Sequence, residues 1–185
     1  MTVSTPHSPH ARFFALVPCA GSGSRAGTAI PKQYQPVAGL PMVRHTLAAF
    51  AAVPRIARCL VVVAPSDDFL QPLEPPFALA ACGGATRAAS VRNGLQALLA
   101  LGAAPGDWVL VHDAARCLIT PALINSLIDA CAQDAVGGLL AHRLADTLKS
   151  EVDGRVGATV DRSGKWLAQT PQRFRIGMLQ DALAQ

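Results

Sequence analysis

The chain has 185 residues, 51% hydrophobic and 5% aromatic, which excludes a disordered chain and favours one domain with an aliphatic core. Its net charge of +4 arises from 16 basic and 12 acidic residues. This mild excess is interpreted as ordinary solubility. If the excess cations converge on one cleft, an anionic substrate is favoured over nucleic acid, because no basic and aromatic stripe is visible.

Membrane and secreted proteins are not expected either. The first residues, MTVSTPHSPHAR, lack the apolar stretch of a secretory leader, and no apolar run has the length of a membrane span. The five cysteines are scattered without a C-x-x-C pair, which fits reduced thiols better than disulfides or a zinc site. We therefore predict a cytoplasmic protein.

Short apolar runs alternate with helical patterns along the chain. Residues 1–11 are polar and are predicted to form a disordered lead-in to one domain that spans residues 12–185. Uninterrupted apolar runs predict buried strands at 13–17, 59–64, 77–82, 108–112 and 137–141. Apolar residues at helical spacing predict helices at 42–53, 87–102 and 120–131. This alternation predicts a three-layer α/β/α fold with a mostly parallel sheet covered on both faces.

The segment 144–174 has a different composition from the rest of the chain. It is polar, and its Asp-Gly and Ser-Gly pairs predict turns between short extended pieces. We interpret it as a β-arm that projects from the sheet and suits a partner subunit. A surface hairpin without a partner is the alternative.

The loop after the first predicted strand is rich in glycine. It is not a P-loop, because its lysine follows Pro31, and its glycines have the spacing G-x-G-x-x-x-G, one residue too long for a dinucleotide fingerprint. Its backbone N–H groups could approach a phosphate chain closely, and Arg25 and Lys32 add positive charge. Cleavage of a nucleoside triphosphate at its α-phosphorus needs such cations. A surface loop with two solvated cations is the alternative.

Two further loops follow the third and fourth predicted strands. Ligands of parallel α/β sheets bind beyond the carboxyl ends of the strands, where these loops lie. A Gly-Gly pair precedes Arg87 and Ser90 at the start of a helix, where a free hydroxyl could bind a base or ribose. Asp113 comes directly after an apolar strand and could hold Mg²⁺ against phosphate oxygens, or merely cap a helix. His112 is interpreted as a hydrogen-bonded residue that ends the strand, not as a general base.

Six motifs in order closely resemble the 2-C-methyl-D-erythritol 4-phosphate cytidylyltransferases of the non-mevalonate isoprenoid pathway, from about Phe13 to the last residue. They are PCAGSGSRAG, PKQY, GGATRAASVRNGL, VHDAAR, DTLK and VDRSGKWLAQTPQRF. The resemblance implies a Rossmann-like nucleotidyltransferase domain, a homodimer joined through the β-arm, and Mg²⁺-dependent transfer of CMP from CTP to methylerythritol 4-phosphate. It also implies that the family's chains continue with a segment carrying a second metal-binding carboxylate and a lysine. The alternatives are another polyol phosphate acceptor, such as ribitol 5-phosphate, and a non-catalytic remnant that binds nucleotide or dimerises.

The same resemblance implies a role for each site residue. Arg25 and Lys32 would stabilise the transition state, and Asp113 would bind the metal. Arg116, Thr147 and Arg162 would hold the acceptor, with Thr147 and the catalytic Arg162 reaching across from the partner's arm. The nucleotide would lie against Pro18, Cys19, Ala20, Gly21, Gly23, Gly84, Ser90, Asp113 and Ala114. Because the nucleophile is the acceptor's own ionised phosphate, no general base would be required.

Overall fold

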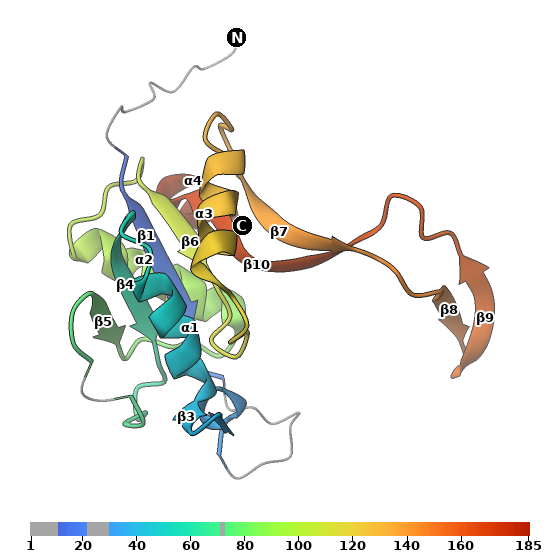
Figure 1. Cartoon of the computed structure of the whole chain (residues 1–185), viewed down its shortest axis with the longest axis horizontal. Coiled ribbons are helices and arrows are strands. Elements are labelled where there is room, and N and C mark those ends of the chain that lie inside the picture. Colours follow the sequence, from blue (N-terminus) through green and yellow to red (C-terminus); the bar gives the residue numbers. More distant parts are fainter. Residues whose placement is uncertain (1–10, 22–29, 71–72) are drawn as a thin grey trace.

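The computed structural model describes residues 11–21, 30–70 and 73–185 of the chain. Residues 1–10 of the predicted lead-in lie outside these ranges, as do Gly23 and Arg25. Within the described ranges, a six-stranded sheet has the spatial order β5-β4-β1-β6-β10-β7 (Figure 1). Its strands are β1 (Phe13–Pro18), β4 (Ile56–Val62), β5 (Phe77–Ala80), β6 (Trp108–Val111), β7 (Gly137–Arg143) and β10 (Trp166–Arg175).

The sheet is mostly parallel, which confirms the prediction. β1 pairs in parallel with β4 and β6, and β4 pairs in parallel with β5, whereas β10 runs antiparallel to β6 and β7. The carboxyl ends of β1, β5 and β6 therefore meet at one edge of the sheet, and this edge carries the three loops singled out in the sequence.

Helices cover both faces of the sheet. α1 (Met42–Ala51) and α3 (Pro121–Ala130) pack on the face that carries Ala15 and Val17, and α2 (Arg87–Ala100) and α4 (Ile176–Ala182) pack on the opposite face. Successive residues of a strand point to opposite faces, so a continuous apolar run such as β1 supplies both cores. The predicted three-layer architecture is confirmed.

Capping residues fix where two of these helices begin. The hydroxyl of Thr86 accepts a hydrogen bond from Ala89 N–H (3.0 Å) at the start of α2. That of Thr120 accepts from Leu123 N–H (3.3 Å) at the start of α3, where Pro121 takes the first helical position. A proline there loses no intrahelical hydrogen bond, since that N–H has no partner in a helix. The Thr86 cap thus fixes the start of α2 directly after the loop that follows β5.

The β-arm extends away from the sheet (Figure 1). It is formed by the outer parts of β7 and β10 and by a hairpin of β8 (Leu148–Val152) and β9 (Arg155–Val160). The structure departs from the prediction at residues 172–174, which were assigned to the arm. They lie inside the sheet, where Gln172 pairs with both Val111 and Leu139. Short elements complete the fold: η2 (Lys32–Tyr34), β2 (Pro36–Val37) and β3 (Leu40–Pro41).

None of the helices in the described part of the chain combines the length and the apolar character that crossing a membrane requires.

Candidate active site

The start of the glycine-rich loop is held by a side chain that the sequence did not single out. Cys19 N–H continues the ladder by donating to Val62 O (2.7 Å). The buried amide of Gln33 donates from Nε2 to the carbonyls of Cys19 (2.9 Å) and Gly21 (2.8 Å). Gln33 belongs to η2, so these bonds fix the position of Lys32, the residue before it, relative to the loop. The remainder of the loop, residues 22–29, lies outside the described residues.

Cys19 is a packing residue in this loop, not a nucleophile. Its side chain is 2% exposed, and its thiol donates a weak hydrogen bond to Tyr34 Oη (3.5 Å). The Tyr34 hydroxyl in turn donates to Asp67 Oδ2 (2.6 Å). Burial raises the pKa of the Cys19 thiol to about 12, so the reactive thiolate is not formed at neutral pH.

Gly83 allows the loop after β5 to contact the loop after β1. A Cβ atom at Gly83 would lie 2.2 Å from Ala20 Cβ and 2.8 Å from Val63 O, both far inside van der Waals contact. Next to it, Gly84 N–H donates to the hydroxyl of Ser90 (3.0 Å), which itself donates to Thr86 O (3.1 Å). Ser90 is 3% exposed. Contrary to the prediction from the sequence, the hydroxyl is therefore not free: it is bonded to two backbone groups and orders the turn that α2 follows.

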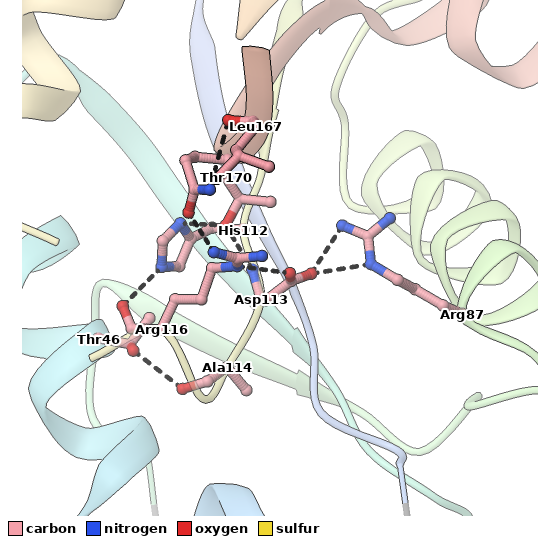
Figure 2. A network of polar contacts seen from close by, with 9 residues as sticks. Thr46, Arg87, His112, Asp113, Ala114, Arg116, Leu167 and Thr170 are labelled. Carbon is pink, nitrogen blue, oxygen red and sulfur yellow. Dashed lines mark hydrogen bonds and ion pairs between the residues drawn. The ribbon is translucent and has the colours of Figure 1, made fainter. Parts of the chain in front are cut away.

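The third loop carries a carboxylate between two guanidinium groups (Figure 2). Arg87 lies 2.7 Å from Asp113 Oδ1, and Arg116 lies 3.0 Å from Oδ2. Arg116 also donates from Nη1 to Gln169 Oε1. Partial burial raises the pKa of Asp113, but the charges and hydrogen bonds of the two arginines outweigh this effect, and the pKa lies below its ordinary value. Asp113 is therefore ionised at neutral pH, in an environment of net positive charge.

Two buried side chains hold the loop after β6 in place. The Thr46 hydroxyl of α1 donates to Ala114 O (2.9 Å). His112 is fully buried, with Nε2 3.1 Å from Arg116 O and Nδ1 3.0 Å from the Thr170 hydroxyl. A carbonyl can only accept, so Nε2 carries the proton and Nδ1 accepts from Thr170. Burial lowers the pKa of His112 to about 4, which agrees with the interpretation of His112 as a hydrogen-bonded residue at the end of the strand.

The buried His112 predicts a pH-dependent stability. Its folded-state pKa of about 4 lies below the ordinary 6.5, so between these values the unfolded chain binds a proton that the folded chain does not. The free energy of unfolding is therefore expected to fall by about 3 kcal/mol as the pH drops from 6.5 to 4. Urea unfolding across this range should show this loss in the wild type but not in His112→Gln. Equal pH profiles for the two proteins would contradict it.

Lys32 and Arg116 line the same cavity. It has a volume of about 470 Å³ and lies over the carboxyl end of β6 and the adjoining parts of β7 and β10. Its polar lining consists of Lys32, His112, Arg116, His142, Gln169 and Thr170, and its apolar lining includes Met42, Leu118, Ile119, Leu123 and Leu140. Two cations thus converge on one hollow beside the glycine-rich loop.

The predicted arm residues do not reach this hollow within one chain. Arg162 donates to the carbonyl of Ala145 and lines a separate cavity of about 260 Å³ with Arg143, Lys165 and Trp166. Thr147 is exposed on the arm near the start of β8. The sheet domain therefore gathers Pro18–Gly21, Lys32, Gly84, Ser90, Asp113, Ala114 and Arg116, while Thr147 and Arg162 belong to the arm.

Cations and a carboxylate at the carboxyl ends of parallel strands are features of α/β enzymes of the nucleotidyltransferase type. The family model of 2-C-methyl-D-erythritol 4-phosphate cytidylyltransferase (IspD) matches residues 13–185, and the chain belongs to this family.

Individual relatives agree with the family assignment. The chain is 54% identical over 178 residues to the 2-C-methyl-D-erythritol 4-phosphate cytidylyltransferase of Paraburkholderia phymatum, covering 93% of this chain and 75% of that protein. It is 69% identical over 175 residues to the bifunctional enzyme IspD/IspF of Albidiferax ferrireducens, covering 93% of this chain and 42% of that protein. The chain thus spans less than half of the bifunctional relative and three quarters of the other.

Solved structures show the same fold. A 4-diphosphocytidyl-2C-methyl-D-erythritol synthase superposes with a TM-score of 0.84 at 41% identity, covering 95% of this chain and 79% of that one. The Francisella tularensis 2-C-methyl-D-erythritol 4-phosphate cytidylyltransferase superposes with a TM-score of 0.79 at 31% identity, covering 94% and 77%.

Proposed function

We propose that this chain transfers the CMP moiety of CTP to 2-C-methyl-D-erythritol 4-phosphate, giving CDP-methylerythritol and pyrophosphate. Family membership supports the reaction. The observation in the structure that carries it is the convergence of Lys32 and Arg116 on one cavity beside the loop that Gln33 holds. Two anionic substrates need a site in which cations face a common space.

The residues suit an in-line displacement at phosphorus. An ionised phosphate oxygen of the acceptor forms the new bond to the α-phosphorus of CTP, and the bond from that phosphorus to the bridging oxygen breaks to release pyrophosphate. Lys32 would stabilise the charge that develops on the phosphoryl oxygens, together with Arg25, and Arg116 would hold the acceptor phosphate. His112 takes no proton in this scheme, because its pKa is about 4 and both ring nitrogens are hydrogen-bonded.

A magnesium ion at Asp113 forms part of the proposal. The described residues contain no group of three or more histidine, cysteine or acidic side chains that could hold a metal. One carboxylate with substrate phosphates and water is, however, an ordinary donor set for Mg²⁺, and Asp113 fits it. When bound, Mg²⁺ would neutralise charge on the phosphates of CTP.

The acceptor is tested by supplying alternatives with CTP. We expect CTP-dependent release of pyrophosphate with methylerythritol 4-phosphate, and CDP-methylerythritol as the product identified by mass spectrometry. Equal or greater turnover of ribitol 5-phosphate would replace the proposed acceptor. Calorimetric binding of CTP without turnover of either acceptor would support a non-catalytic nucleotide-binding protein.

The arm is proposed to join two copies of the chain. It exposes several large apolar side chains, which a monomer rarely leaves in water as a group: Val152 (59%), Val156 (71%), Trp166 (54%) and Leu167 (48%). A homodimer would bring Thr147 and Arg162 of one copy to the cavity of the other. Sedimentation should then give twice the mass of the chain. A cytoplasmic location stays a prediction.

Replacing Arg162 with alanine is expected to raise KM for the acceptor by on the order of ten-fold or more, because a charge-assisted hydrogen bond to its phosphate is lost. CTP affinity, measured by calorimetry, should stay unchanged. Arg155→Ala, which removes an exposed arginine of β9 in the same arm, is the matched control. A fall in CTP affinity instead would show that the arm has been assigned to the wrong substrate.

A further inference from the structure

Asp113 joins two loops that are not neighbours in the sheet. Arg87 opens α2, which follows β5, whereas Asp113 follows β6, and strands β4 and β1 lie between them. The Arg87 guanidinium places both Nε (2.8 Å) and Nη2 (2.7 Å) on Asp113 Oδ1. Figure 2 shows Arg116 on the other side of the carboxylate, with its Nε 3.0 Å from Oδ2. Both carboxylate oxygens therefore have a cationic partner.

This arrangement opposes the binding of a free divalent cation at Asp113. An ion that approached the carboxylate would have to displace a guanidinium, or share the oxygens and meet the repulsion of two positive charges. The pair is not sealed off, because the side chains of Arg87 and Asp113 are 49% and 31% exposed. A competing anion in solution can therefore reach Arg87 and separate it from the carboxylate.

We propose that Arg87 is a positioning residue that keeps Asp113 closed to a free divalent cation until a nucleoside triphosphate gives Arg87 another anionic partner. The inference rests on the proposed function, because it takes a triphosphate as the ligand of the adjoining loops. Arg87 directly follows Thr86, the cap of α2. The Ser90 hydroxyl joins Thr86 O to Gly84 N–H, so the Arg87 side chain begins beside the loop that follows β5.

The consequence is a thermodynamic coupling between cation and nucleotide. Once a phosphate oxygen accepts the hydrogen bonds of the Arg87 guanidinium, Asp113 Oδ1 is available to the cation that the triphosphate carries. Each ligand then binds more tightly when the other is present, and removal of the Arg87 guanidinium weakens this coupling. Arg87 thus acts through Asp113, and a binding measurement without turnover can detect it.

The test follows Mn²⁺ binding by electron paramagnetic resonance of the free ion. Each protein is titrated alone and with a CTP analogue that has a methylene group between the α- and β-phosphates. The variants are Arg87→Ala and Arg87→Lys, with Arg92→Ala as the control because Arg92 is an exposed arginine of the same helix. Combining Arg87→Ala with Asp113→Asn identifies the ions that bind at Asp113.

Without nucleotide, Arg87→Ala is expected to bind Mn²⁺ on the order of ten-fold more tightly than the wild type, because a charge-assisted ion pair no longer competes. Arg87→Lys should lie between them, since an ammonium keeps the charge but cannot place two N–H groups on one oxygen. Arg92→Ala should match the wild type, and Asp113→Asn should abolish the gain.

Equal Mn²⁺ affinities of the wild type and Arg87→Ala in the absence of nucleotide would overturn the inference, as would a gain that persists with Asp113→Asn. These results are independent of the proposed function, which instead fails if the wild type releases no pyrophosphate from CTP with any acceptor. The two failures can therefore be told apart.

Discussion

Replacing Lys32 with alanine is expected to lower kcat by about 10²–10³-fold, the range for loss of one group that stabilises a transition state. Lys32 supplies positive charge to the cavity that it shares with Arg116, while Gln33 and Tyr34 of the same turn anchor the backbone through their own hydrogen bonds. The ammonium can thus be removed without moving the loop. Arg25→Ala, in a part of the loop outside the described residues, is expected to cause a loss of the same size.

Steady-state release of pyrophosphate measures the effect, and circular dichroism verifies the fold. Lys149→Ala is a suitable control, because it removes the same charge from the β8–β9 hairpin. A folded Lys32→Ala protein with a kcat within a few-fold of wild type would rule out the role assigned to Lys32.

Gly83→Ala is expected to destabilise the protein by about 1–3 kcal/mol, the usual range for overpacking, and to abolish measurable CTP binding. The added Cβ would lie 2.2 Å from Ala20 Cβ and 2.8 Å from Val63 O, so the first and second loops have to move apart. These are the loops between which the nucleotide is proposed to bind.

Urea unfolding and calorimetry with CTP measure the two effects separately. Gly106→Ala is the matched control, because a Cβ at Gly106 meets no atom within 4 Å. If Gly83→Ala binds CTP with wild-type affinity, the close contact of the two loops does not form the nucleotide site.

The apolar strands and capped helices could be predicted because their signals are local. β1 and β6 are continuous apolar runs with buried centres, and α3 begins at Pro121, one residue after the predicted start at 120, with Thr120 as its N-cap. The inner half of β10 could not be predicted in this way. Its Gln-Arg-Phe-Arg sequence has the composition of a surface segment, yet Arg173 is 1% exposed, stacks 3.7 Å from the Trp108 ring centroid and donates to Ile128 O (3.1 Å). Only the tertiary structure supplies these partners.

The candidate site likewise has a part that the sequence predicted and a part that only the tertiary structure reveals. Residue types and their places after strands predicted that Lys32 and Asp113 would lie near each other, and the family resemblance added Arg116. The structure brings these residues to one edge of the sheet. The bonds from Gln33 to the first loop and from Arg87 to Asp113 were not predicted, because they join segments whose relative position depends on the packing of the whole domain. Gln33 lies within the PKQY motif, which was the one signal in the sequence that pointed to it.

A crystal structure with CTP and Mg²⁺ bound tests the central claim most directly. The account predicts that the triphosphate lies along the loop after β1, with Lys32 Nζ within hydrogen-bonding distance of an α-phosphate oxygen and Asp113 facing the cation. A nucleotide bound elsewhere on the molecule, or a triphosphate that leaves Lys32 without contact, would contradict it.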